Sequence, residues 1–194
     1  LLRFYNLKPE DMGSIYIDGL DIKTYSKRTY RQHIGIILQD PVLFKGTIAD
    51  NIRFGVDISD AEIERILREI GGDKLLDKLE NGIHSPVSRQ GSNFSVGEKQ
   101  IIAFARAVVH NPAILVMDEA TANIDTETEI MIQTALNKVK IGRTTIVIAH
   151  RLSTIKNADK IVVLEKGIKV EEGKHSDLLA NNGVYANIYR SQIK

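Results

Sequence analysis

The chain has 194 residues, 43% of them hydrophobic, so it is long enough and apolar enough to bury a core as one globular domain. Its 26 basic and 25 acidic residues leave a net charge of +1. This excludes the strongly positive overall potential that would attract nucleic acid or an anionic membrane surface. The lack of cysteine excludes a disulfide framework. The longest apolar runs are far shorter than the roughly 20 residues of a membrane span, so we expect no segment to cross a bilayer.

The first third of the chain predicts two strands. Residues 14–17 (Ser-Ile-Tyr-Ile), followed by an Asp-Gly pair, predict a short strand and a tight turn. Residues 34–38 (Ile-Gly-Ile-Ile-Leu) predict a buried strand that ends at Gln39. The first five residues resemble the end of an amphipathic helix that begins upstream, so we expect the chain to be part of a longer polypeptide.

The middle of the chain predicts helices. A short one can begin in residues 47–51, and residues 59–70 predict an amphipathic helix that opens with a Ser-x-x-Glu capping box. A second capping box, formed by Ser95 and Glu98, opens a helix that should run to about residue 109.

The last third predicts alternating strands and helices. Residues 114–117 form a short continuous apolar run, typical of a strand buried on both faces of a parallel sheet, and residues 144–149 predict a third buried strand. Asp125 can cap the helix between these two strands. The remaining predictions are two strands over 161–164 and 167–170 and a terminal helix over 176–193 with a break near Gly183.

Three predicted strands each end at polar side chains, namely Gln39, Asp118 with Glu119, and His150. Because ligands of open α/β sheets bind at the carboxyl ends of the strands, we expect these side chains to converge on one crevice. Two adjacent carboxylates at the end of a buried strand destabilise the fold unless a cation binds them. We therefore expect a partner such as Mg²⁺ bound to phosphate. Each residue alone also has a structural explanation: solvated loop acids, a turn-forming glutamine, or a histidine that satisfies a hydrogen bond. Because such residues occur at all three strand ends, we favour a functional site over three separate structural explanations.

Several stretches resemble the nucleotide-binding domain of an ABC transporter in order and spacing. They are Gln39-Asp40-Pro41, residues 94–100 (Phe-Ser-Val-Gly-Glu-Lys-Gln), residues 114–121, Asn123-Ile124-Asp125 and Ile148-Ala149-His150-Arg151. The resemblance covers almost the whole chain and is nearest to the exporter type through residues 43–53 and 150–155.

The resemblance implies an α/β fold of the P-loop NTPase (RecA-like) class, with a mostly parallel sheet and an inserted α-helical subdomain. Residues 1–41 would belong to the RecA-like core up to the Q-loop, and residues 42–110 would form the helical subdomain that ends in the signature helix. Residues 111–194 would complete the core with the Walker B strand, the D-loop, the H-loop and the C-terminal helix.

The resemblance also implies a role for each polar strand end. Asp118 would hold Mg²⁺ at the β and γ phosphates of ATP, and Glu119 would orient and polarise the attacking water. Gln39 would contact the metal or the water and relay its position to the membrane-facing helical part. His150 would contact the γ-phosphate.

A second group of residues would serve the ATP molecule held by an opposite subunit. Ser95, Val96, Gly97 and Glu98 match the signature motif, and a serine-capped helix start independently suits phosphate. Asp125 falls in the D-loop, which would cross the dimer interface. The implied unit is a homo- or heterodimer of modules with two ATP molecules and transmembrane domains, at the cytoplasmic face of a membrane. No nucleic-acid partner is implied.

The chain departs from the family pattern at the signature motif. Val96 replaces a glycine and Glu98 replaces a glutamine, which puts a negative charge near the expected phosphate. The capping box gives Glu98 a structural role. In the preceding loop, Ser88 and Arg89 stand where exporters commonly carry Gly-Glu, a difference that would suit one half of a heterodimeric exporter.

No Gly-x-x-x-x-Gly-Lys-Ser/Thr pattern occurs in the 194 residues, so we expect them not to bind ATP tightly on their own. Two other hypotheses stay open. A soluble ABC-type ATPase that maintains or repairs DNA is disfavoured, because no coiled-coil heptads and no basic stripe lie between Gln39 and Ser95. A non-hydrolysing regulatory module that pairs with a complete partner is favoured only if no phosphate loop precedes Leu1.

Overall fold

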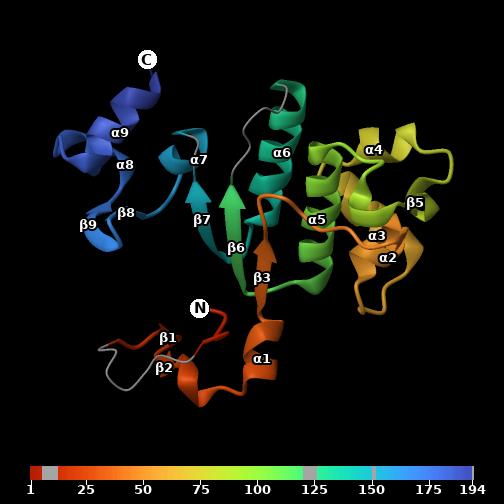
Figure 1. Ribbon diagram of the computed structural model, residues 1–194, viewed down its shortest axis with the longest axis horizontal. Helices are drawn as coiled ribbons and strands as arrows, with labels where there is room; N and C mark the ends of the chain where they lie inside the picture. Colours follow the sequence, from red (N-terminus) through yellow and green to blue (C-terminus); the bar gives the residue numbers. More distant parts are fainter. Residues whose placement is uncertain (6–12, 120–125, 150–151, 194) are drawn as a thin grey trace. The chain divides into compact units, whose positions relative to one another are not determined.

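A computed structural model of the chain describes residues 1–5, 13–119, 126–149 and 152–193 (Figure 1). The chain forms two compact units. The first comprises Leu1–Asp118 and Ala122–Val147, and the second comprises Glu119–Thr121 and Ile148–Lys194. The predicted division at residues 41 and 110 stays a prediction.

A hairpin and a short helix precede the sheet in the first unit. Strands β1 (Tyr16–Ile17) and β2 (Leu20–Asp21) pair antiparallel around the predicted turn. A 3₁₀ turn, η1 (Ile22–Thr24), leads to helix α1 (Lys27–Gln32), which the sequence analysis did not predict. A small cluster joins this region to the sheet; its buried members are Ile22, Tyr30 and Ile34.

The central sheet has the strand order β3-β6-β7. Strand β3 (Ile34–Ile37) pairs with β6 (Ile114–Glu119) in parallel, with Ile37 opposite Met117. Strand β7 (Thr144–Ala149) follows β6 in the sheet, and Figure 1 shows all three arrows pointing the same way. The predicted parallel sheet is therefore confirmed.

The prediction that all three strands are buried is wrong for β7 and only half correct for β3, where Ile34 and Ile37 are buried but Ile36 is 40% exposed. Strand β6 buries Leu115 and Met117 and half-buries Ile114 and Val116, as expected for a central strand. Along β7, exposed and half-buried residues alternate, and Ile146 is 46% exposed. The reason is that one face of β7, which carries Val147, packs on the main core, whereas the face that carries Ile146 is exposed.

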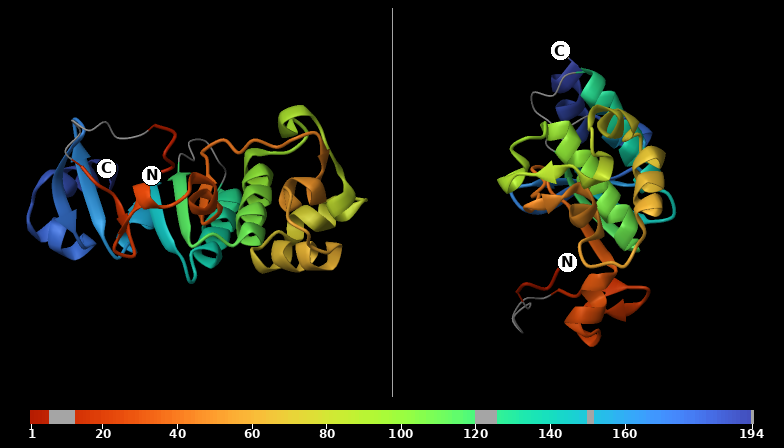
Figure 2. Two further views of the ribbon diagram at one scale, coloured as in Figure 1. Left: turned by 90° about the horizontal axis from the view of Figure 1, so that it is seen from below. Right: turned by 90° about the vertical axis from the view of Figure 1, so that its right-hand side faces the viewer.

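Helices and short strands follow β3. Strand β4 (Gly46–Thr47) pairs with β5 (Pro86–Val87), and between them lie helices α2 (Ile48–Arg53), α3 (Asp60–Glu69) and α4 (Asp73–Lys78) and the 3₁₀ turn η2 (Gly82–His84). Another 3₁₀ turn, η3 (Arg89–Gly91), precedes α5 (Val96–His110). In both views of Figure 2 the orange-to-yellow helices lie beside the green α5. The predicted helices near 47–51, 59–70 and 95–109 are confirmed, whereas α4 was missed.

Two capping boxes fix helix starts in this region. The Thr47 side chain and Asp50 cap α2 reciprocally, as Ser95 and Glu98 cap α5. At α3 the prediction is only half correct. The Ser59 side chain accepts the N–H of Glu62, but the Glu62 carboxylate binds Arg65 instead of the backbone.

The main core lies between the sheet and the helices. It joins α2, α3 and α5 to one face of the sheet and to helix α6 (Thr126–Val139). Its fully buried side chains include Ile52, Ile63, Leu67, Ile101, Ile102, Leu115 and Val139. Packing of this kind, rather than intrinsic propensity, stabilises such short helices.

The second unit contains α7 (Leu152–Lys156), the hairpin of β8 (Ile161–Glu165) and β9 (Ile168–Gly173), and the helices α8 (His175–Ala180) and α9 (Val184–Ile193). The predicted hairpin and helix break are confirmed, and α7 was missed. The Glu171 carboxylate accepts the N–H groups of Val184 and Tyr185 and so begins α9. Within the described residues, we find no helix of the length and apolar character that a membrane span requires.

Candidate functional site

Two of the predicted site residues lie at the same end of neighbouring parallel strands. Ile37 of β3 is opposite Met117 of β6, so Asp118 follows one position and Gln39 two positions after the last paired residues. Gln39 is exposed and Asp118 is half-buried. The carboxyl ends of these strands therefore present an amide and a carboxylate at one edge of the sheet, where ligands of α/β folds bind.

Asp118 is the residue predicted to hold Mg²⁺. Across the described ranges no side chain or N–H group donates a hydrogen bond to it, although it is half-buried. Nor do three or more His, Cys, Asp or Glu side chains cluster anywhere in the part of the chain that the structure describes. The predicted role of Asp118 as a Mg²⁺ ligand stays a prediction.

Three other predicted residues are only partly covered by the structure. Glu119 is the last residue of β6, and its backbone alone is described. His150 directly follows β7, the strand next to β6, but it lies outside the described residues, as does Asp125. Their predicted roles stay predictions.

The start of α5 has the local geometry expected of an anion-binding helix end. The Ser95 hydroxyl accepts the N–H of Glu98 at 3.2 Å, and Glu98 Oε2 accepts the N–H of Ser95 at 2.7 Å. The N–H groups of Val96 and Gly97, in the first turn, have no partner within the helix, and the helix dipole adds positive potential there. Val96 is exposed. These features are those of helix starts that bind phosphate in general, and the predicted role of this one stays a prediction.

Gly97 has a packing role that the sequence analysis did not predict. It is buried, and a Cβ added to it would lie 2.2 Å from Cγ2 of Thr128 on α6. A side chain at this crossing would force Thr128 or the two helices to shift. The glycine is therefore required by helix packing, whatever its contact with phosphate.

The segment that follows Gln39 is tied to α5 by two cations. Lys99 Nζ lies 3.6 Å from Oδ1 of Asp40, and Arg106 donates from Nη1 to the carbonyl oxygen of Val42 at 3.2 Å. Arg106 also donates from Nε to the carbonyl oxygen of Asn51 at 2.7 Å. The helix that begins at Ser95 thus holds both α2 and the chain that leaves β3.

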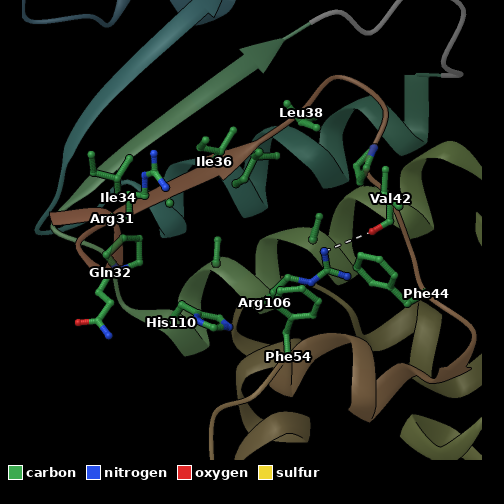
Figure 3. Close-up of a pocket in the computed structure, with 16 residues that line it drawn as sticks. Arg31, Gln32, Ile34, Ile36, Leu38, Val42, Phe44, Phe54, Arg106 and His110 are labelled. Atoms are coloured by element: carbon green, nitrogen blue, oxygen red, sulfur yellow. Dashed lines mark hydrogen bonds between the residues drawn. The ribbon is translucent and has the colours of Figure 1, made fainter. Parts of the chain in front are cut away.

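Arg106 also contacts two aromatic rings (Figure 3). Its guanidinium carbon lies 5.8 Å from the ring centre of Phe44 and 5.1 Å from that of Phe54, within the range of cation–π attraction. The two rings stack with their centres 5.3 Å apart. Burial lowers the pKa of Arg106, but an arginine remains charged at neutral pH.

A cavity of about 360 Å³ adjoins this cluster (Figure 3). Its wall includes exposed apolar side chains that follow β3 and α2, namely Leu38, Val42, Phe44 and Phe54, together with Arg106 and His110 of α5. None of these side chains was among the predicted site residues. A signal was present in the sequence, because Arg106 stands among apolar residues of a predicted helix. Arginine is seldom buried in such a helix unless it is paired.

Comparison with known proteins identifies the family. The profile described as ABC transporter matches residues 1–122. The probable multidrug resistance ABC transporter ATP-binding/permease protein YheH of Bacillus subtilis is 52% identical over 193 residues, covering 99% of this chain and 28% of that protein. The ATP-dependent lipid A-core flippase of Saccharophagus degradans is 46% identical over 194 residues, covering 100% of this chain and 33% of that protein.

A solved structure agrees with these relatives. The structure of a bacterial Atm1-family ABC exporter with ATP bound matches with a TM-score of 0.88 and 42% identity, covering 100% of this chain and 34% of that one. The fold is thus that of the P-loop ATPase domain of ABC exporters, and the chain spans about a third of the length of these relatives. ATP hydrolysis is characteristic of such domains. On this evidence the chain belongs to the ABC transporter family.

Proposed function

We propose that this chain is the ATP-hydrolysing module of a membrane exporter. The observation that carries the proposal is the placement of Gln39 and Asp118 at the ends of adjacent parallel strands, in a chain of the ABC transporter family. An acceptor carboxylate without a described partner and a neighbouring exposed amide are suited to a metal-bound phosphate and a water molecule.

Each candidate residue has a distinct task in this proposal. Asp118 holds Mg²⁺, which when bound neutralises charge on the β and γ phosphates of ATP. Glu119 orients and polarises the attacking water, and Gln39 and His150 position the water and the γ-phosphate. A second group of residues binds the ATP of the opposing module across a dimer interface: Ser95, Val96, Gly97, Glu98 and Asp125.

The partner of the module is a membrane-spanning domain, with the module at the cytoplasmic face of a bacterial cell membrane. Support comes from the relative named as an ATP-binding/permease protein, of which this chain matches 28%. The exposed apolar wall formed by Leu38, Val42, Phe44 and Phe54 gives the module a surface for that domain. Because Arg106 binds the carbonyl oxygen of Val42, a movement of this surface is transmitted to α5.

The proposal is tested by Glu119→Gln in the native full-length polypeptide, with Mg-ATP turnover and ATP binding measured in parallel. We expect turnover to fall by about 10²- to 10⁴-fold, because the substitution removes the group that polarises the water, while ATP binding is retained. A matched control is Glu165→Gln, since Glu165 also ends a strand, and it should leave turnover unchanged.

Turnover that persists in Glu119→Gln would remove Glu119 from this role. Failure of the unmodified polypeptide to hydrolyse ATP would instead favour a regulatory module that pairs with a complete partner.

A further inference from the structure

The first turn of α5 carries an ion pair that links it to α4. Lys78, the last residue of α4, donates from Nζ to Oε1 of Glu98 at 2.7 Å. The other carboxylate oxygen, Oε2, accepts the N–H of Ser95. Both oxygens of Glu98 are therefore engaged, and its side chain is only 15% exposed.

The charge of Glu98 is a difficulty for a phosphate-binding helix end. A carboxylate in the first turn stabilises the helix through the dipole, but it also cancels the positive potential that attracts an anion. Burial alone would raise the pKa of Glu98. The hydrogen bonds from Lys78 and Ser95 outweigh burial and hold that pKa below its usual range, so the carboxylate is charged at neutral pH.

Lys78 supplies the compensating charge. With an ammonium 2.7 Å from the carboxylate, the pair is neutral as a whole. The free N–H groups in the first turn of α5 can then still attract an anion. The sequence analysis did not predict this contact, because the two residues are 20 positions apart in different helices.

We propose that Lys78 is a positioning residue for ATP: by neutralising Glu98 and fixing it in the capping box, it keeps the N–H groups of Val96 and Gly97 available to phosphate. The inference rests on the proposed function, since it requires that the start of α5 contacts ATP. It explains how the chain can carry a glutamate in its signature motif and still bind an anion there.

The test measures KM and kcat for Mg-ATP in the native full-length polypeptide and its variants. The variants are Lys78→Ala, Lys78→Arg, Glu98→Gln and the double variant Lys78→Ala/Glu98→Gln. Lys78→Ala should raise KM roughly two- to fivefold, the effect of one unscreened charge at a helix terminus. Lys78→Arg keeps the charge and should retain the original KM. In the Glu98→Gln background, which keeps a capping side chain, removal of Lys78 should have no effect.

A matched control is Lys160→Ala in the other unit. Lys160 Nζ pairs with Glu172 at 3.0 Å, and its side chain is 65% exposed, the same fraction as that of Lys78. This control should leave KM unchanged. The melting temperature of every variant is measured alongside, because a purely structural ion pair would alter it without altering KM.

Two results would overturn the inference while leaving the proposed function intact: an unchanged KM in Lys78→Ala, or an equal rise in KM with and without Glu98. In both cases the unmodified polypeptide hydrolyses ATP and Glu119→Gln does not. Absence of turnover in the unmodified polypeptide would overturn both proposals together.

Discussion

The two halves of helix α5 are held in different ways. The cap of its first turn joins residues close in the chain, since Ser95 and Glu98 cap each other and the serine hydroxyl is three positions from its donor. Its second half is fixed by Arg106, which reaches Asn51, 55 positions away, and Val42, 64 positions away. The capping contact therefore depends on local sequence, whereas the contacts of Arg106 depend on the completed fold.

This difference predicts how each half responds to substitution. A capping contact contributes about 1 kcal/mol, and water can replace it at an exposed helix end. The Arg106 contacts join α5, α2 and the segment after β3, and the carbonyl groups they satisfy lose their donor together if the arginine is removed. We therefore expect the larger effect on stability in the second half.

The largest expected effect comes from Arg106→Met. Loss of the guanidinium leaves the carbonyl oxygens of Asn51 and Val42 without this donor, which should cost about 2–4 kcal/mol of unfolding free energy. Arg106→Lys should be intermediate, because one ammonium cannot replace the forked contacts. The measurement is the denaturant midpoint followed by circular dichroism.

The control for this experiment is Arg68→Met. Arg68 pairs with Asp73 at 3.2 Å with both side chains 52% exposed, and such a pair contributes less than about 1 kcal/mol. If Arg106→Met cost no more than this control, the contrast between the two halves of α5 would be wrong.

A smaller effect is expected from Gly97→Ala at the first turn. The added Cβ would overlap Cγ2 of Thr128, so α5 and α6 must separate, at a cost of about 1–3 kcal/mol. Adding Thr128→Ser removes that methyl group and keeps the hydroxyl, and should restore most of the stability. Thermal unfolding of the single and double variants checks this.

Gly13→Ala serves as the control, because within the described residues no heavy atom lies within 4 Å of a Cβ built there. Full stability of Gly97→Ala would show that the close approach of α5 and α6 is not required. Lost stability without rescue by Thr128→Ser would point to a different neighbour.

The smallest expected effect concerns pH. Burial, followed by the charge of Arg106, lowers the pKa of His110, while a hydrogen bond to the backbone of Arg53 acts in the opposite direction. With the folded pKa below the unfolded one, the unfolded chain binds more protons, so stability falls as pH drops below about 7. His110→Gln should flatten this decline in melting temperature by at most about 1–2 °C.

The control for the pH experiment is internal. Above about pH 7.5 His110 is neutral in both states, so the difference in melting temperature between the two proteins should be constant there. A decline of equal slope in both proteins at lower pH would assign it to other groups.

Much of the fold was predictable because its signals are local. The strands followed from short apolar runs, and α5 followed from a capping box within four residues. Helices α1, α4 and α7 were missed because five or six residues hold too little periodic pattern to separate a helix from a loop. The burial of β7 was misjudged because an apolar run alone does not say whether one or both faces of a strand are covered.

The site was predictable only in part, for a related reason. Gln39 and Asp118 follow apolar strands, so chain order and the rules of parallel sheets are enough to bring them together. Arg106 and Lys78 act through partners that the folded chain supplies, at separations of 20 positions or more. A cation has no periodic signature, and its partner can be chosen only when the packing of the helices is known.

The contact between Arg106 and Val42 has one more consequence. The arginine binds the carbonyl oxygen of position 42, which every amino acid carries, while the side chain of that residue is exposed on the cavity wall. Substitution at this position can therefore alter the chemistry of the wall and leave its anchor in place. In evolution or in design, such a surface can be adapted to a new partner without rebuilding the scaffold beneath it.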